Sequence, residues 1–299
     1  VPALLERDRL RVRRGQMASP VGDLGHAVHD EADALLAQGL EDVVALPGDL
    51  EHRGPAEGGP VAGAVVPERQ AVPDERVAPI HAPRRNIMCL GKNYADHAKE
   101  MSQDGQGKPP EFPMFFSKAT TTINAPYGDI PFDANVSTHI DWEAELVVII
   151  GKRGKNISQA DAMNYVFGYT VINDVTARDM QKNHGQFFKG KSLDGCCPMG
   201  PWIVTADEIP DPHNLYVRCR VNGVTKQDGH TKDLIYKIPA ILESLSRGMT
   251  LEPGDVIATG TPSGVGAGRT PPEWLKPGDV VECEVEGIGT IKNKVANSG

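Results

Sequence analysis

Short apolar runs, each ended by a glycine or a polar residue, follow one another along the chain from about residue 84 onward. Segments 86–90, 146–150 and 168–173 have strand length, and the first two stop at Gly91 and Gly151. Every position of 146–150 is apolar, so we predict a strand there that is buried on both faces.

Two further patterns are typical of antiparallel sheet. Asn222-Gly223 separates the segments 216–221 and 224–226, and this dipeptide favours a type I′ hairpin turn. Valine or cysteine alternates with glutamate over 281–286, which predicts a strand with one buried and one solvated face.

Helical patterns are fewer. Leucine and isoleucine recur at helical spacing over 233–247, and Gly248 stands where a residue that ends a helix is common. Ser158 and Asp161 resemble a capping box that opens a second helix through Tyr165. Because predicted strands outnumber helices and hairpin signals dominate, we expect an α+β, β-rich fold.

The first 80 residues differ from the rest of the chain. They are rich in alanine, valine, glycine and proline, and a helix around residues 30–38 is the one regular element that their pattern favours. We found no catalytic motif in them. The sequence therefore predicts a small N-terminal domain over 1–80 and a catalytic domain over 81–299.

Composition narrows the class of protein. A net charge of −9 disfavours a nucleic-acid partner, and 39% hydrophobic residues suffice for a packed core. The five cysteines include no Cys-x-x-Cys pair, which is typical of reduced thiols. We recognise no signal peptide and no apolar run of about 18 residues. These features predict a cytoplasmic protein that has no membrane partner.

One segment places an ionisable residue at every second position: His139, Asp141, Glu143 and Glu145. On a continuous strand all four would share one face, and Glu143 and Glu145 would reach one bound ion together. Asp174 ends another apolar strand and is the best candidate for a third ligand. Three carboxylates favour a hard cation, Mg²⁺ before Mn²⁺. The alternative is a solvated edge strand with ordinary surface acids.

A histidine and a glutamate form a second candidate constellation. His97 and Glu100 would be neighbours on a helix, where the carboxylate orients the imidazole as a general base. An incidental pair on a surface helix has the same spacing. The following stretch is rich in glycine and proline, so this helix is also a candidate lid.

A glycine-rich segment, 254–268, is the third constellation. It lacks the Gly-Lys-Ser/Thr of a phosphate-binding loop, and no helix follows it as a dinucleotide site requires. Two interpretations remain open. The glycines serve a tight turn, or they let backbone N–H groups and the Thr261 hydroxyl approach a substrate carboxylate.

Together these segments resemble the fumarylacetoacetate hydrolase superfamily, over about residues 84–295. The motifs that carry the resemblance are Gly91-x-Asn93-Tyr94-x-x-His97-x-x-Glu100, Asp141-x-Glu143-x-Glu145-Leu146, Asn173-Asp174-x-Thr176-Ala177-Arg178-Asp179-x-Gln181, Lys189-Gly190-Lys191-Ser192 with Cys197-Pro198, and Gly260-Thr261-Pro262-x-Gly264-Val265-Gly266. The chain is too short for the large N-terminal domain of the human-type tyrosine-catabolic enzyme, so it resembles more closely the compact branch of acylpyruvate hydrolases, oxaloacetate decarboxylases and hydroxyheptadienedioate isomerases.

The resemblance implies a mixed β-roll, a homodimer and a Mg²⁺ or Mn²⁺ cofactor. It implies these residue roles: Glu143, Glu145 and Asp174 as metal ligands; His97, Glu100 and Lys191 as catalytic groups; Asn93, Tyr94, Arg178, Gln181 and Thr261 as substrate contacts. The partner would be a small anionic 2-oxo acid.

The expected reaction is hydrolysis of a carbon–carbon bond in a 2,4-dioxo acid such as an acylpyruvate. Alternatives on the same site are an oxaloacetate-type decarboxylase and a 2-hydroxyhepta-2,4-diene-1,7-dioate isomerase. A carboxylate-binding regulatory protein and a Ca²⁺-stabilised structural domain are the non-enzymatic alternatives.

Overall fold

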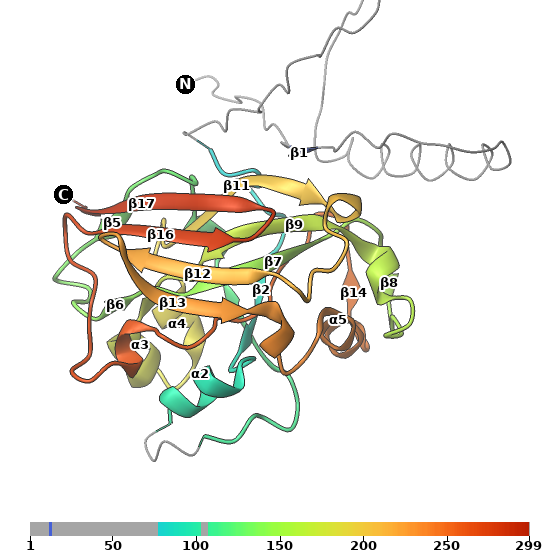
Figure 1. Cartoon of the computed structure of the whole chain (residues 1–299), viewed down its shortest axis with the longest axis horizontal. Helices are drawn as coiled ribbons and strands as arrows, with labels where there is room; N and C mark the ends of the chain where they lie inside the picture. The colour runs from blue at the N-terminus through green and yellow to red at the C-terminus, as the bar shows by residue number, and fades with distance from the viewer. Residues whose placement is uncertain (1–11, 14–76, 103–106, 299) are drawn as a thin grey trace, which may run out of the picture. The chain divides into compact units, whose positions relative to one another are not determined.

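A computed structural model describes residues 12–13, 77–102 and 107–298. Two sheets form most of this part, and four short α-helices accompany them (Figure 1). The strands are β1 (Val12–Arg13), β2 (Ile87–Gly91), β3 (Met114–Lys118), β4 (Ile123–Asn124), β5 (Ile130–Phe132), β6 (Ile140–Asp141), β7 (Ala144–Ile150), β8 (Gly154–Lys155), β9 (Val166–Asn173), β10 (Thr176–Ala177), β11 (Cys197–Thr205), β12 (Tyr216–Val221), β13 (Val224–His230), β14 (Thr250–Leu251), β15 (Val256–Ala258), β16 (Val280–Val285) and β17 (Gly289–Asn297). The helices are α2 (Ala95–Glu100), α3 (Arg178–Asn183), α4 (Phe187–Lys191) and α5 (Ile238–Ser246).

The larger sheet has eight strands in the order β1-β11-β9-β7-β15-β2-β3, with β4 paired to β11. Parallel and antiparallel pairs both occur, so the sheet is mixed. Strand β7 lies at its centre and is buried along its whole length. The apolar run 146–150 is therefore a strand covered on both faces, as predicted.

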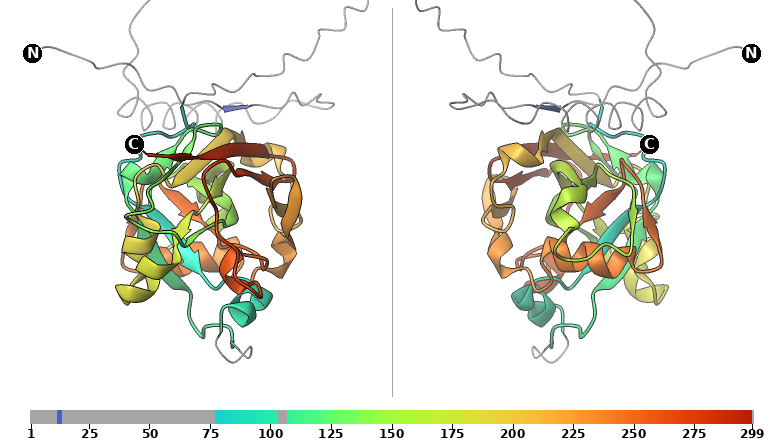
Figure 2. Two further views of the ribbon diagram at one scale, coloured as in Figure 1. Left: turned by 90° about the vertical axis from the view of Figure 1, so that its left-hand side faces the viewer. Right: turned by 90° about the vertical axis from the view of Figure 1, so that its right-hand side faces the viewer.

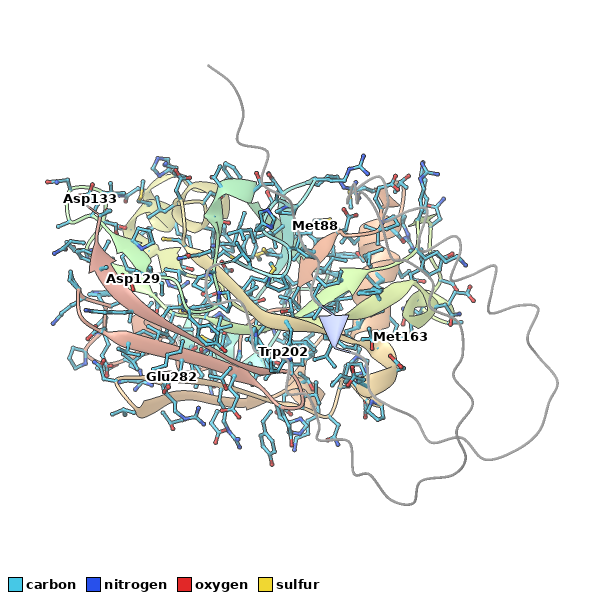
Figure 3. All side chains as sticks on the ribbon, turned by 90° about the horizontal axis from the view of Figure 1, so that it is seen from above. Met88, Asp129, Asp133, Met163, Trp202 and Glu282 are labelled. Carbon is cyan, nitrogen blue, oxygen red and sulfur yellow. The ribbon has the colours of Figure 1, made fainter. Side chains whose placement is uncertain are left out.

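The smaller sheet has five strands in the order β13-β12-β16-β17-β5. Val281, Cys283 and Val285 of β16 are buried in the same core as Leu146 and Val148 of β7. Figure 3 shows side chains filling the space around both sheets. This curled, mixed arrangement confirms the predicted β-rich α+β fold of β-roll type.

Helices α2, α3 and α4 lie at the same end of the two sheets (Figures 1 and 2). Helices α3 and α4 approach closely because residue 190 is glycine: a Cβ there would stand 2.4 Å from Gln181 N. The close approach brings Lys191, at the end of α4, into the buried interior, where 2% of it is exposed.

The predicted hairpin is confirmed. Strands β12 and β13 pair across Asn222-Gly223, whose φ angles of 50° and 77° are those of a type I′ turn. The alternating strand 281–286 is also confirmed, as β16.

The expectation of one strand carrying His139, Asp141, Glu143 and Glu145 is wrong. The strand is interrupted between β6 and β7, because side chains take the place of backbone hydrogen-bond partners there. Asn173 Oδ1 accepts the N–H of Glu143 at 2.9 Å. His139 is left outside the carboxylate cluster: its ring packs on Trp274 and its side chain is 46% exposed.

Both predicted helices are shorter than expected. Ser158 and Asp161 do hydrogen-bond to each other, but only a 3₁₀ turn, Ala162–Tyr165, fits before β9 begins. The helix predicted over 233–247 begins at Ile238, because the preceding residues bind another segment. Ile235 N donates to Asn93 O, and Leu234 forms a bridge with Tyr94.

The predicted N-terminal domain, with its helix over 30–38, lies outside the described residues apart from 12–13 and 77–80. Within the described ranges, no helix combines the length and apolar character that crossing a bilayer requires.

Helix α5 generates a prediction about stability and pH. Its first N–H group, on Ile238, donates to His213 Nε2 at 3.1 Å, which requires an unprotonated ring nitrogen. Burial, followed by the charge of Lys237, lowers the pKa of His213 below its ordinary 6.5, against an opposing effect of Asp211. Stability from this contact is complete above the unfolded pKa and falls as the pH drops toward the lowered folded pKa.

We therefore expect the urea midpoint to fall between about pH 7.5 and pH 5, with a shallower fall in His213→Gln, whose amide stays neutral. Identical slopes for the two proteins would contradict this role of His213.

Candidate metal and proton-transfer site

Three buried carboxylates meet between β7 and β9. Glu143 directly precedes β7, Glu145 is the second residue of that strand, and Asp174 follows the last residue of β9. The register pairs Ala144 with Asn173, which sets Asp174 opposite the two glutamates. One oxygen from each carboxylate lies within 4.8 Å of the others, and all three residues are less than 5% exposed. The structure thus brings together all three predicted metal ligands.

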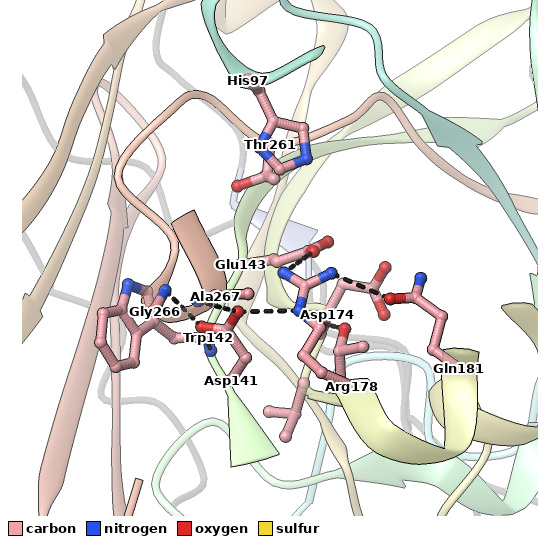
Figure 4. A network of polar contacts seen from close by, with 12 residues as sticks. His97, Asp141, Trp142, Glu143, Asp174, Arg178, Gln181, Thr261, Gly266 and Ala267 are labelled. Atoms are coloured by element: carbon pink, nitrogen blue, oxygen red, sulfur yellow. Dashed lines mark hydrogen bonds and ion pairs between the residues drawn. The ribbon is translucent and has the colours of Figure 1, made fainter. Parts of the chain in front are cut away.

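Two buried lysines and the part-buried Arg178 surround this carboxylate cluster. Lys191 Nζ contacts Glu143 Oε2 at 2.7 Å and Asp174 Oδ2 at 2.8 Å. Lys118 Nζ lies 2.8 Å from Asp174 Oδ1, and the Arg178 guanidinium lies 2.6 Å from Glu143 Oε1 (Figure 4). Buried carboxylates need such partners, because burial without them disfavours ionisation.

Glu143 and Glu145 differ in their share of this positive charge. Burial alone raises the pKa of Glu143, but Lys191 and Arg178 outweigh it and hold the pKa at about 2. Burial and the charges of Asp174 and Glu143 raise the pKa of Glu145 well above its usual 4.5. Glu145 has no ion-pair partner in the part of the chain that the structure describes, and its Oε2 accepts the N–H of Gly260 at 2.7 Å. It is therefore the carboxylate that most needs an added cation.

The donor set fits a hard divalent cation. All three groups are carboxylates, and Asp174 Oδ1 has no hydrogen bond of acceptable geometry among the described residues, although Lys118 lies at ion-pair distance. Oxygen ligands within a few ångströms suit Mg²⁺ or Mn²⁺ better than a thiophilic metal. The cluster can hold one divalent ion.

The His97–Glu100 pair lies on α2. His97 Nδ1 contacts Glu100 Oε1 at 2.8 Å, and the histidine is 6% exposed. Glu100 accepts the N–H of Gly264, in the same loop whose Gly260 N–H donates to Glu145, so one loop joins the pair to the carboxylates. In the view of Figure 4 the His97 ring lies above Glu143, and no dashed contact joins the two. A carboxylate on Nδ1 favours the tautomer with Nε2 unprotonated.

The glycine-rich loop binds the protein's own carboxylates. Gly260 N donates to Glu145, Gly264 N to both oxygens of Glu100 at 2.9 and 3.1 Å, and Gly266 N to Asp141 at 2.6 Å. Gly264 has φ +104° and its Cβ would stand 2.1 Å from Lys226 O, so no larger residue fits. Backbone N–H groups do approach carboxylates, as one interpretation expected, but these carboxylates belong to the site itself.

Asp141 joins this loop to the rest of the site. It is fully buried, and its oxygens accept the N–H groups of Gly266 and Ala267 and the Nε of Arg178 at 2.8 Å (Figure 4). Arg178 in turn contacts Glu143 and, at 3.2 Å, Gln181 Oε1. Asp141 therefore links the glycine-rich loop to the carboxylate cluster. The interpretation of 139–145 as one strand missed this role.

The residues predicted to contact substrate have different environments. Arg178 and Gln181 border the carboxylates through the contacts just described. Thr261 Oγ1 donates to Ala144 O and accepts from Gln227 Nε2, so this hydroxyl already supports β7. The amide of Asn93 is likewise engaged, with Thr259 O and Tyr236. Their contacts with a substrate remain predictions.

Tyr94 is the exception among them. It is 3% exposed, and its hydroxyl has no hydrogen-bond partner among the described residues. Burial and the charge of Glu145 raise its pKa. This phenol therefore stays protonated and remains free to donate.

Two functional residues escaped the sequence analysis. Lys118 is completely buried at the end of β3, and its sequence signal is a lysine two residues after the apolar run Met114-Phe115-Phe116. Gln227, also fully buried, accepts the N–H of Ala144 at 3.0 Å and donates to Thr261. Nothing in the surrounding sequence distinguishes it from an ordinary strand residue.

Metal binding should release a proton. Since the pKa of metal-free Glu145 is raised, this carboxyl stays protonated to a higher pH than an ordinary glutamate does. It must lose that proton to become a metal ligand. We expect Mg²⁺ affinity to rise with pH above about 4.5 until Glu145 is ionised, and calorimetry in buffers of different ionisation enthalpy to detect the released proton. Binding heats that do not depend on the buffer would contradict this assignment.

Replacing Asp141 tests the link. Asp141→Asn keeps the shape but places an amide against four N–H donors, those of Trp142, Gly266, Ala267 and Arg178, so we expect a loss of about 3–5 kcal/mol in unfolding free energy and weaker Mn²⁺ binding. Asp133→Asn, in an Asx turn away from the site, should change stability by less than about 1 kcal/mol. Equal effects of the two substitutions, measured by urea titration, would disprove the special role of Asp141.

Comparison with known proteins agrees with this geometry. The fumarylacetoacetate (FAA) hydrolase C-terminal family model matches residues 86–296. Oxaloacetate tautomerase YisK of Bacillus subtilis is 52% identical over 219 residues, which are 73% of this chain and 72% of the relative. A solved fumarylacetoacetate hydrolase of Exiguobacterium antarcticum is 51% identical, with TM-score 0.67, over 74% of this chain and 78% of that one. The solved 2-hydroxyhepta-2,4-diene-1,7-dioate isomerase of Mycobacterium marinum is 40% identical, with TM-score 0.64, over 75% and 78%. The chain belongs to the fumarylacetoacetate hydrolase family, whose members are enzymes.

Proposed function

We propose that this protein is a Mg²⁺- or Mn²⁺-dependent enzyme that moves a proton beside the oxo group of a small anionic 2-oxo acid. Keto–enol tautomerisation of oxaloacetate is the leading reaction. The observation that carries the proposal is the His97–Glu100 pair next to the buried cluster of Glu143, Glu145 and Asp174. The name of the Bacillus subtilis relative supports tautomerisation over the hydrolysis that the sequence analysis expected.

The proposed site supplies a base and a set of positive charges. A bound divalent ion would act as a Lewis acid toward the oxo and carboxylate oxygens of the substrate. Glu100 keeps the ring proton of His97 on Nδ1, so Nε2 has the lone pair that a general base needs. Lys191, buried beside the cluster, adds a fixed positive charge that stabilises a developing enolate.

Proton transfer then runs through His97. Nε2 takes a proton from the carbon next to the oxo group, and the electrons of that C–H bond form the carbon–carbon double bond of the enolate. Return of the same proton to the enolate oxygen gives the enol and restores neutral His97. No bond to water is formed, so the reaction needs only this dyad and the surrounding charge.

Hydrolysis of a 2,4-dioxo acid is the second candidate. The same Nε2 would take a proton from a water that attacks the distal carbonyl, after which the carbon–carbon bond breaks and leaves an enolate. The complete dyad and the name of the Exiguobacterium antarcticum protein favour it. A decarboxylase needs no base of this kind, which makes it less favoured on this site.

The test is turnover by metal-stripped protein supplied with Mg²⁺ or Mn²⁺. Substrates are the enol of oxaloacetate, followed by ultraviolet absorbance, and acetylpyruvate and fumarylpyruvate, followed by release of pyruvate. We expect metal-dependent decay of the enol signal, reduced at least about 100-fold in His97→Ala and in Glu145→Gln. Glu145 is the better ligand to replace, because loss of Glu143 would also remove one of the two carboxylate partners of Lys191 and of Arg178.

Glu252→Gln is the matched control, since Glu252 pairs with Arg153 at the surface, and it should retain full activity. If the metal-dependent release of pyruvate from acetylpyruvate or fumarylpyruvate is faster than the decay of the oxaloacetate enol, the second candidate, hydrolysis, is supported instead. If none of the three substrates is turned over, both candidates fail.

A further inference from the structure

Tyr236 contacts both sides of the helix that carries His97 and Glu100. It lies just before α5, in the segment that the periodicity predicted as helix and that the structure instead uses for contacts with Asn93. Its N–H donates to Asn93 Oδ1 at 2.8 Å, and its carbonyl accepts from Asn93 Nδ2 at 3.0 Å. Its hydroxyl donates to Pro110 O at 2.6 Å.

Two segments flank α2: Asn93 before it, and residues 107–110 after it, which contact the end of the helix through the bond from Gly107 N to Ser102 Oγ at 2.8 Å. Asn93 stands two residues before the helix begins at Ala95, and Pro110 lies on the return of the chain toward β3. The first flank is tied further, because Asn93 O accepts from Ile235 N at 2.8 Å. Among the described residues, the second flank makes one long-range hydrogen bond with a side chain, and its donor is the Tyr236 hydroxyl.

Helix α2 depends on such outside contacts. It has six residues and no side-chain cap at its start, far short of the length at which a helix is stable alone. Apolar packing does little for the return of the chain, since Phe112 is 74% exposed and Pro109 and Glu111 are exposed. The location of α2 therefore rests on its buried residues His97 and Ala98, on hydrogen bonds at its flanks and on the bond from Gly264 N to Glu100.

We propose that Tyr236 is a positioning residue for the His97–Glu100 dyad. By fixing both flanks of α2, it holds Glu100 where Gly264 N reaches it and His97 where it neighbours Glu143. This inference rests on the proposed function, because it assigns the dyad a part in proton transfer. A displacement of about 1 Å in such a base is enough to slow proton transfer greatly.

The test removes one hydroxyl. Tyr236→Phe keeps the ring and both backbone contacts with Asn93, and it removes only the bond to Pro110 O. We expect faster amide exchange over α2 and residues 107–112, and kcat/KM lower by about five- to tenfold. Mn²⁺ binding by calorimetry and the melting temperature should match the unchanged protein, since the carboxylate cluster is not touched.

Two comparisons separate positioning from a general structural role. Tyr216→Phe, on β12, removes a hydroxyl from a tyrosine that is 43% exposed and should change neither exchange nor turnover. In a Glu100→Gln background, where the imidazole is no longer oriented, Tyr236→Phe should cause little further loss.

Unchanged exchange over α2 and 107–112 in Tyr236→Phe would overturn the inference, whatever the substrate is. An equal loss of turnover in the Glu100→Gln background would also overturn it, because the effect would then not pass through the dyad. Absence of turnover by the unchanged protein would contradict the proposed function alone. The amide-exchange measurement would still decide whether Tyr236 holds α2 in place.

Discussion

The dominant physical constraint on this structure is negative charge buried in a small volume. Three carboxylates lie within 4.8 Å of one another in the interior, where charges interact several times more strongly than in water. Lys118, Lys191 and Arg178 compensate Glu143 and Asp174, and none of the described residues forms an ion pair with Glu145. Much of the surrounding architecture follows from placing those cations and from keeping each carboxylate hydrogen-bonded.

The compensating groups come from distant parts of the chain. Lys118 ends β3, Arg178 begins α3 and Lys191 ends α4, so strand pairing and the close α3–α4 contact must both form before the charges balance. The loop after β15 adds neutral donors, with N–H groups directed at Glu145, Glu100 and Asp141. One loop thus contacts the carboxylate cluster, the His97–Glu100 dyad and Asp141, which binds Arg178.

Sequence reasoning reached the strands and the ligands through local patterns. The uniformly apolar 146–150 and the Asn222-Gly223 turn depend on neighbours in the chain, and both predictions were confirmed. The metal ligands were found because carboxylates at alternate positions beside an apolar run are chemically unusual. Spacing alone left surface acids as an alternative, and the burial of the cluster decides against it.

What could not be predicted depends on contacts between distant segments. The break before Ala144 arises because Asn173 and Gln227 supply its hydrogen-bond partners, and neither is near in sequence. The helix expected from residue 233 begins later because Leu234 and Ile235 bind next to Asn93. In the sequence, Lys118 is indistinguishable from the polar end of an ordinary strand. Its carboxylate partner, Asp174, lies 56 positions further along the chain.

The pairing of β7 with β9 has one more consequence. Glu145 lies on β7, Glu143 directly precedes that strand and Asp174 directly follows β9, with Ala144 opposite Asn173. A slip of one residue would turn the side chains of one strand to the opposite face and separate Asp174 from the glutamates. Tight ion binding is thus a property of a single alignment of the two strands, so the ion distinguishes the correctly aligned sheet from compact misaligned forms and favours it during folding.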